Sequence, residues 1–157
     1  MSEIHQRPVS AEQEIVIRET STDDLDAIIG IDLQNSGVSK PEYWREAFES
    51  CRDHRDTRFF LVAERNSEVI GFIVGEIRAW EFGSPPCGWV FVIGVERDER
   101  LEGTGSKLMA SLCAAFRAAG ISKIRTMVAK QNHELLAFFR SQGMMAGPYQ
   151  QLETDLD

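Results

Sequence analysis

The chain has 157 residues, a length typical of one domain, and its hydrophobic content of 43% is enough to build a full core. A net charge of −8 argues against nucleic acid or an anionic membrane surface as the main partner. Three cysteines (Cys51, Cys87 and Cys113) form no C-x-x-C pair and the three histidines are scattered, so the sequence predicts no metal site. Unpaired thiols favour a reducing, cytoplasmic location, and we expect neither a signal peptide nor a membrane span.

The first third of the chain predicts one strand followed by two helices. Residues 1–13 are polar and aperiodic, so we expect a flexible tail there and a single domain over residues 14–157. A strand is expected over 14–19. A helix follows from about Thr22, with apolar residues at helical spacing: Leu25, Ile28, Ile29 and Leu33. Pro41 begins the second helix, whose apolar side carries Tyr43, Trp44, Ala47, Phe48 and Cys51.

The remaining two thirds predict five strands and two helices. The expected strands cover 58–64, 68–80, 89–95, 123–129 and a closing strand within 147–156. One helix ends at Gly120, and the other runs from His133 to about Gln142, capped by Asn132. The connection between 89–95 and 123–129 is helical, so those two strands should be parallel. The element order is β-α-α-β-β-β-α-β-α-β, an α/β fold with a mixed sheet.

A loop with two glycines follows the apolar strand at 89–95. Gly103 and Gly105 let the backbone turn tightly and come close to a ligand. A loop that opens a helix also presents unpaired N–H groups and the positive end of the helix dipole. The segment Arg100 to Ser106 therefore predicts a pyrophosphate-binding loop, with an ordinary strand-to-helix turn as the alternative. The P-loop and dinucleotide fingerprints both fail, the latter because Leu108 replaces the third glycine.

The pattern Arg100-x-x-Gly103-x-Gly105, placed behind a strand that ends at Val95, resembles the acetyl-CoA motif of the GNAT family of N-acetyltransferases, V-x-x-x-x-R-x-x-G-x-G. The family usually has proline where Arg97 stands, and a small or basic residue where Glu102 stands. Because a carboxylate beside a pyrophosphate is unfavourable, we expect Glu102 to point to solvent.

A second signature of the family is matched further along the chain. It consists of an asparagine, an aromatic position seven residues later and a glycine four residues after that, which here are Asn132, Phe139 and Gly143. The resemblance covers nearly the whole chain. It implies a GNAT-like fold, in which a mixed central β-sheet carries helices on both faces.

The resemblance also implies an activity: transfer of an acetyl group from acetyl-CoA to a primary amine by direct attack in a ternary complex, without a metal. The acceptor stays open between a small amine, a lysine side chain and a protein N-terminus, and a homodimer stays open as well. A backbone N–H near Ile93 or Val95 would polarise the thioester carbonyl, with Gly94 allowing a bulge. The cofactor-binding residues that the resemblance implies are Ile93, Val95, Arg100, Leu101, Glu102, Gly103, Thr104, Gly105, Ser106, Asn132, Phe139 and Arg140.

The acid and the base of the reaction are harder to assign. Family members usually have a tyrosine that protonates the CoA thiolate, and Phe139 stands at that position without a hydroxyl. Tyr149 is the candidate acid, with an ordinary half-buried tyrosine as the alternative. Glu76 is the candidate base, because we expect it across the hairpin from Ile93; a solvent-facing carboxylate is its alternative. The missing tyrosine also keeps open a non-catalytic acyl-CoA-binding or regulatory module.

Overall fold

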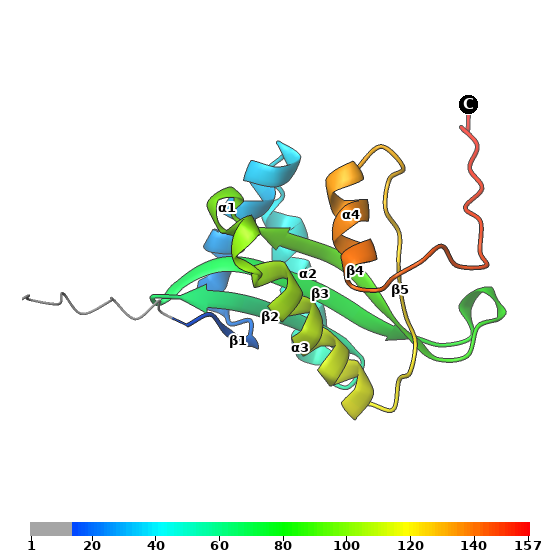
Figure 1. Cartoon of the computed structure of the whole chain (residues 1–157), viewed down its shortest axis with the longest axis horizontal. Helices are drawn as coiled ribbons and strands as arrows, with labels where there is room; N and C mark the ends of the chain where they lie inside the picture. Colours follow the sequence, from blue (N-terminus) through cyan, green and yellow to red (C-terminus); the bar gives the residue numbers. More distant parts are fainter. Residues whose placement is uncertain (1–13) are drawn as a thin grey trace, which may run out of the picture. The chain divides into compact units, whose positions relative to one another are not determined.

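The computed structural model describes residues 14–157, apart from the side chains of Leu101 and Glu102 (Figure 1). The tail predicted for residues 1–13 therefore lies outside the described residues. The described chain divides into two compact units: the first contains the sheet and ends at Thr126, and the second runs from Met127 to Asp157. The elements are β1 (Val16–Glu19), η1 (Thr22–Asp24), α1 (Leu25–Ser36), α2 (Pro41–Asp53), β2 (Arg58–Arg65), β3 (Glu68–Arg78), η2 (Glu81–Gly83), β4 (Cys87–Val95), η3 (Arg97–Glu102), α3 (Thr104–Ala118), β5 (Ile124–Thr126) and α4 (His133–Ser141), where η marks a 3₁₀ helix.

The first unit contains one five-stranded sheet with the strand order β1-β2-β3-β4-β5. Neighbouring strands from β1 to β4 pair antiparallel, whereas β4 and β5 pair parallel across the helical connection α3. A parallel pair needs such a long crossover, because a tight turn can join only antiparallel strands. The predicted α/β class and the mixed sheet are confirmed.

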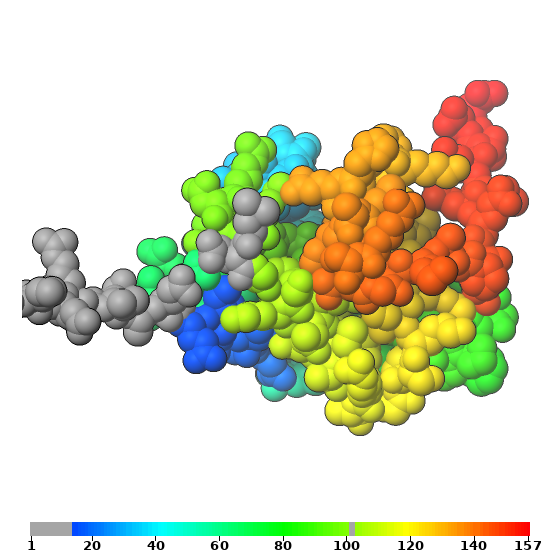
Figure 2. Space-filling view, in the orientation of Figure 1, coloured from blue at the N-terminus to red at the C-terminus, as the bar shows by residue number. Residues whose placement is uncertain are grey.

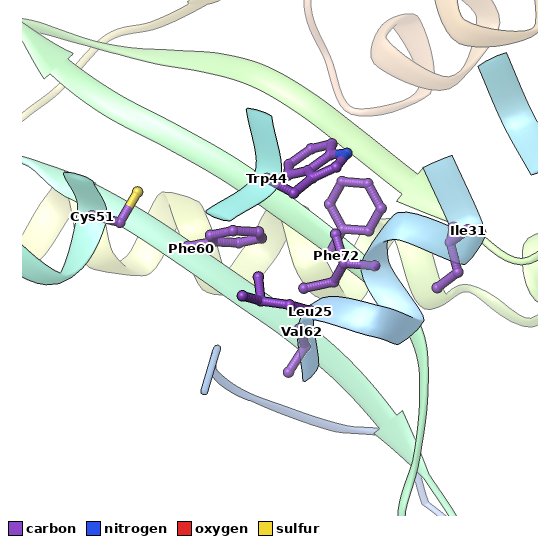
Figure 3. Close-up of a cluster of buried hydrophobic side chains, with 8 residues drawn as sticks. Leu25, Ile31, Trp44, Cys51, Phe60, Val62 and Phe72 are labelled. Atoms are coloured by element: carbon purple, nitrogen blue, oxygen red, sulfur yellow. The ribbon is translucent and has the colours of Figure 1, made fainter. Parts of the chain in front are cut away.

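Helices α1 and α2 cover one face of the sheet (Figure 1). Figure 3 shows their apolar side chains meeting those of β2 and β3 in a buried cluster. Strand residues alternate between the two faces, so Phe60, Val62 and Phe72 can all contribute to it. The helices contribute Leu25, Ile28, Ile31, Trp44 and Cys51. Burial of these side chains fixes α1 and α2 against the part of the sheet that leads into β4.

Helix α3 covers the other face, so the prediction of helices on both faces is confirmed. The ring of Phe59 on β2 lies 5.4 Å from that of Phe116 on α3, in an edge-to-face arrangement. Gly88 lets the helix approach the sheet closely, since a Cβ there would lie 2.6 Å from the Phe116 ring. Figure 2 shows the solvent side of α3 in yellow-green. Among the described residues, no helix combines the length and the apolar character needed to cross a bilayer.

Several details differ from the sequence prediction. The closing strand expected within 147–156 is absent: the segment has no regular structure, and no described strand pairs with it. Strand β5 is shorter than predicted, covering only Ile124–Thr126. Leu33 is exposed, and Ile31 is buried in its place. The missing closing strand has a physical reason. A segment forms a strand only beside a hydrogen-bonding neighbour, and its own sequence does not reveal whether such a neighbour is available.

The connection between β3 and β4 contains two aromatic residues in left-handed backbone conformation. Trp80 has φ 68° and Phe82 has φ 54°, and their side chains are 71% and 73% exposed. Left-handed backbone is unfavourable for residues with a bulky Cβ substituent. The backbone of this turn is therefore strained, and because both rings are largely exposed, their burial offsets little of that strain.

Replacing Phe82 with asparagine should stabilise the protein, because asparagine tolerates the left-handed region better. We expect the free energy of unfolding to rise by about 1 kcal/mol, measured by urea denaturation. Val38→Asn is the matched control, since Val38 is also an exposed apolar loop residue but does not have a positive φ. An equal gain in both variants would mean that relief of backbone strain is not the cause.

Candidate functional site

On the side of β5, the last part of β4 has no paired strand among the described residues, and we call this its open edge. Strand β5 pairs only with Gly88–Val90, and β4 continues to Val95. On its other side, the backbone N–H of Glu96 donates to Ile70 O at 2.9 Å, so residue 96 faces β3. Because hydrogen-bonded and non-hydrogen-bonded positions alternate along an antiparallel pair, the amides of Val95 and Ile93 point away from β3. These are the two donors that the sequence predicted for a thioester carbonyl.

The bulge in β4 lies at Phe91, not at Gly94. Val74 pairs with Val92 while Gly75 pairs with Val90, which leaves Phe91 as the extra residue. Gly94 sits in regular register, and its lack of a side chain has a packing reason. A Cβ on Gly94 would lie 2.6 Å from the Phe72 ring. The prediction that Gly94 permits the bulge is therefore wrong, although a bulge is present two residues before Ile93.

The segment between β4 and α3 is more ordered than the open loop expected from its sequence. Residues Arg97–Glu102 form the 3₁₀ helix η3, in which N–H groups donate to carbonyls three residues back. Gly103 follows with φ 76°, and Thr104 begins α3. The N–H of Lys107 already donates to Gly103 O at 3.1 Å. The first turn of α3, where an α-helix places N–H groups that have no acceptor within the helix itself, therefore begins at Thr104.

Two arginines of η3 connect this segment to the end of α1. Arg97 Nη2 donates to the backbone oxygen of Gln34 at 3.0 Å. Arg100 Nη2 donates to Asn35 Oδ1 at 2.5 Å, and Arg100 Nε lies 3.4 Å from Val95 O. The motif arginine therefore has contacts that position the corner between β4 and η3. Sequence reasoning interpreted Asn35 only as part of a helix-ending segment and missed this contact, which no local pattern reveals.

Carboxylates surround the start of the same segment. Burial, together with the charges of Glu99, Asp98 and Glu68, raises the pKa of Glu96. Glu99 forms an ion pair with Arg65 of β2, which offsets one of these negative charges. The described residues contain no group of three or more histidine, cysteine, aspartate or glutamate side chains placed to bind a metal ion. The expected position of Glu102 toward solvent lies outside the described side chains.

Thr104, the first residue of α3, adds a side-chain feature that the sequence did not single out. It is 0% exposed, and its Oγ1 has no hydrogen-bond partner among the described residues. A buried hydroxyl without a partner is rare and costly. The sequence motif predicted a role in cofactor binding only for the backbone N–H of Thr104. No local sequence pattern predicts that its side chain is buried.

Glu76 lies opposite Trp89, not opposite Ile93, which pairs with Ile73. The predicted register was wrong by several residues, because the hairpin is centred between residues 82 and 83, with Arg78 paired to Cys87, and not on residues 83–86 as the sequence suggested. The Glu76 carboxylate is 3.2 Å from Arg58 Nε and 3.7 Å from Arg78 Nε, and its side chain is 19% exposed. Its position along the strand is on the order of 10 Å from Ile93.

The remaining predicted site residues belong to the second unit. Asn132 Oδ1 accepts the N–H of Leu135 at 3.1 Å, which confirms Asn132 as the cap of α4. Phe139 lies beside Phe138, with ring centroids 5.2 Å apart, and Arg140 is in the last turn of α4. Gly143 ends this region with φ 86°. Tyr149 lies in the irregular segment that replaces the predicted closing strand, and it is 50% exposed.

Comparison with known sequences identifies a family and related proteins. A sequence model of the acetyltransferase (GNAT) family matches residues 25–144, more than half of the chain. An L-2,4-diaminobutyric acid acetyltransferase of Nocardia farcinica is 30% identical over 89 residues, covering 57% of this chain and 44% of that protein. A mycothiol acetyltransferase of Thermobispora bispora is 30% identical over 89 residues, covering 56% of this chain and 30% of that protein. The chain thus matches less than half the length of either relative.

Solved structures show the same fold. An aminoglycoside N-acetyltransferase in complex with CoA superposes with a TM-score of 0.81 and 16% identity, covering 94% of this chain and 98% of that chain. A structure described as a transcriptional regulator from Bacillus halodurans superposes with a TM-score of 0.76 and 18% identity, covering 91% of this chain and 100% of that chain. At these identities the likeness concerns the fold alone.

Proposed function

Because this chain belongs to the acetyltransferase (GNAT) family, we propose that it transfers an acetyl group from acetyl-CoA to a primary amine by direct attack in a ternary complex. The observation that carries the proposal is the open edge of β4. There the amides of Ile93 and Val95 point away from β3, and the strand leads through η3 into the first turn of α3. One polypeptide segment thus offers donors suited to a thioester and to a pyrophosphate.

The proposed roles follow from the chemistry of these donors. The N–H of Ile93 or Val95 donates to the thioester oxygen and stabilises the charge that develops there when the amine attacks. The N–H groups of Thr104, Gly105 and Ser106 bind pyrophosphate oxygens at the positive end of α3. The contacts of Arg97 and Arg100 with the end of α1 hold these two sets of donors in a fixed position relative to each other. The cofactor-binding roles of Asn132, Phe139 and Arg140 are predicted from the sequence motif alone.

No side chain is assigned as the acid in this proposal. Phe139 has no hydroxyl, and Tyr149 lies in an irregular segment of the second unit. A CoA thiol has an ordinary pKa close to that of cysteine, about 8.5, so its thiolate can leave with a proton from solvent. The attacking amine must lose its proton first, and we propose that water accepts it.

Glu76→Gln tests whether this carboxylate is the base instead. Its distance from Ile93 and its contacts with Arg58 and Arg78 favour a structural ion pair. We therefore expect kcat/KM to change less than threefold with an unchanged pH profile, while the free energy of unfolding falls by about 1 kcal/mol. Loss of the rise in kcat/KM toward high pH would instead identify Glu76 as the base.

The first acceptors to test are small primary amines. One relative is named for the acetylation of 2,4-diaminobutyric acid, a small molecule with two amino groups. Lysine side chains and protein N-termini are the other acceptor classes. The alternative function, a non-catalytic acyl-CoA-binding or regulatory module, is supported by Phe139, because that position lacks the usual hydroxyl.

Release of free CoA thiol from acetyl-CoA, measured against a panel of small amines, lysine peptides and N-terminal peptides, tests the proposal. We expect acceptor-dependent release with at least one small amine, together with a mass increase of one acetyl group on that amine. Saturable CoA binding without acceptor-dependent release across the panel would favour the non-catalytic module. Absence of CoA binding would exclude both functions.

A further inference from the structure

A cavity of about 290 Å³ lies in the first unit, away from the open edge of β4. Its wall is formed by the end of β1, the start of η1, the second half of α2 and the start of β2. The charged residues of its lining are Arg52, Arg55, Arg58 and one carboxylate, Glu19. Asp53 and Asp56, which separate these arginines in the sequence, are not part of the lining. The volume is near the lower end of small-molecule sites, which begin at roughly 300 Å³.

Two arginines of this cavity, Arg52 and Arg55, have only weak, exposed partners. Arg55 lies 3.9 Å from Glu19, and both side chains are more than 70% exposed. Arg52 is 3.3 Å from its exposed sequence neighbour Asp53, whereas Arg58 is 3.2 Å from the partly buried Glu76. The exposed ion pairs of Arg52 and Arg55 contribute little to stability. A guanidinium group can therefore turn to an incoming carboxylate or phosphate, which it binds through two parallel N–H donors.

A second feature of the cavity is independent of charge. Thr20 lines it, and the buried Oγ1 of Thr20 has no hydrogen-bond partner among the described residues. The backbone N–H of Thr20 donates to Phe60 O at 3.0 Å, which fixes the residue in the wall while its hydroxyl stays unused. Native structures rarely leave a buried hydroxyl unpaired, and this one belongs to a residue of the cavity wall, so rotation of the Thr20 side chain would bring it to a polar ligand atom.

Another part of the lining is apolar. Phe48, Phe60 and Cys51 contribute to it, and Figure 3 shows Cys51 and Phe60 at one side of the buried cluster. Burial raises the pKa of the Cys51 thiol to about 11, so the thiol stays neutral and adds to the apolar surface. The cavity thus combines cationic and hydroxyl groups with a hydrophobic wall.

We propose that this cavity binds a small organic anion. Its carboxylate or phosphate group contacts Arg55, Arg58 and Thr20, and its short apolar body packs against Phe48 and Phe60. The site is separate from the acetyl-CoA site and does not depend on the proposed acetyl transfer.

Binding of benzoate, butyrate and inorganic phosphate tests this site, measured by ligand-observed NMR with saturating CoA present so that the first turn of α3 is already occupied. We expect saturable millimolar binding of benzoate, and weaker binding of phosphate because it has no apolar body. Arg55→Ala should weaken benzoate binding about tenfold. Arg45→Ala, which removes an exposed arginine of α2 outside the cavity lining, should change it less than twofold. No saturable binding, tighter binding of phosphate than of benzoate, or equal losses in the two variants would overturn the proposal.

Thr20→Val provides a second test that does not depend on charge. It removes the unpaired hydroxyl, so we expect the melting temperature of the free protein to stay the same or rise while benzoate binding weakens at least threefold. A folded variant with unchanged benzoate affinity would contradict the role of this hydroxyl. Because the acetyl-transfer assay reports on a different site, its failure and the failure of this proposal are distinguishable.

Discussion

Replacing Gly103 with valine should abolish the thermal stabilisation of this protein by acetyl-CoA. Gly103 has φ 76° and directly precedes the first turn of α3. A Cβ at this position would meet no protein atom within 4 Å, so the added side chain points into open space where the proposed pyrophosphate must approach the backbone. Valine also disfavours the left-handed conformation and would rotate the adjacent N–H groups. At 1 mM acetyl-CoA, we expect the melting temperature of the variant to be unchanged by the ligand.

Gly120→Val is the matched control for this experiment. Gly120 follows the opposite end of α3, has φ 81°, and also has no protein atom within 4 Å of an added Cβ. The two variants should therefore lose similar stability, on the order of 1–2 kcal/mol. Only Gly103→Val should lose the response to acetyl-CoA. Retention of the full response in Gly103→Val would show that the first turn of α3 does not bind the pyrophosphate.

The sequence predicts the part of the site that depends on local signals. An uninterrupted apolar strand, a glycine that requires positive φ and an amphipathic helix follow each other between Trp89 and Gly120, and each is legible within a few residues. The same holds for Asn132, whose side chain caps α4 as expected. These features need no knowledge of which strands pair.

What the sequence does not predict is register. Glu76 is opposite Trp89 because the turn before β4 is centred earlier than its sequence suggests, and the bulge at Phe91 then shifts the pairing of Ile93 by one residue. Both features depend on contacts across the sheet. The contacts of Arg97 and Arg100 with Gln34 and Asn35 span more than 60 residues. The absent closing strand has the same origin, since alternation in the sequence does not supply a neighbouring strand.

Replacing Trp44 with alanine should destabilise the protein more than any other substitution proposed above. Trp44 is 1% exposed, and its ring lies 5.0 Å from that of Phe72 and 5.8 Å from that of Phe60. Its Nε1 donates to Asp32 Oδ2 at 2.9 Å, which joins α2 to α1. Removing a buried tryptophan costs about 3–5 kcal/mol through lost burial and a cavity. This is a large fraction of the roughly 5–15 kcal/mol that stabilises a typical domain.

The effect should extend to the proposed site, because Asp32 lies one turn before the residues that contact η3. Trp44→Phe separates the two contributions: it keeps an aromatic ring in the core but removes the donor to Asp32, and we expect a loss of about 1–3 kcal/mol. Trp80→Ala is the control for tryptophan removal at an exposed position, with an expected change within about 0.5 kcal/mol. Urea denaturation followed by far-UV circular dichroism measures all three variants. If Trp44→Ala were as stable as Trp80→Ala, the cluster between α2 and the sheet would not be the main core of this face.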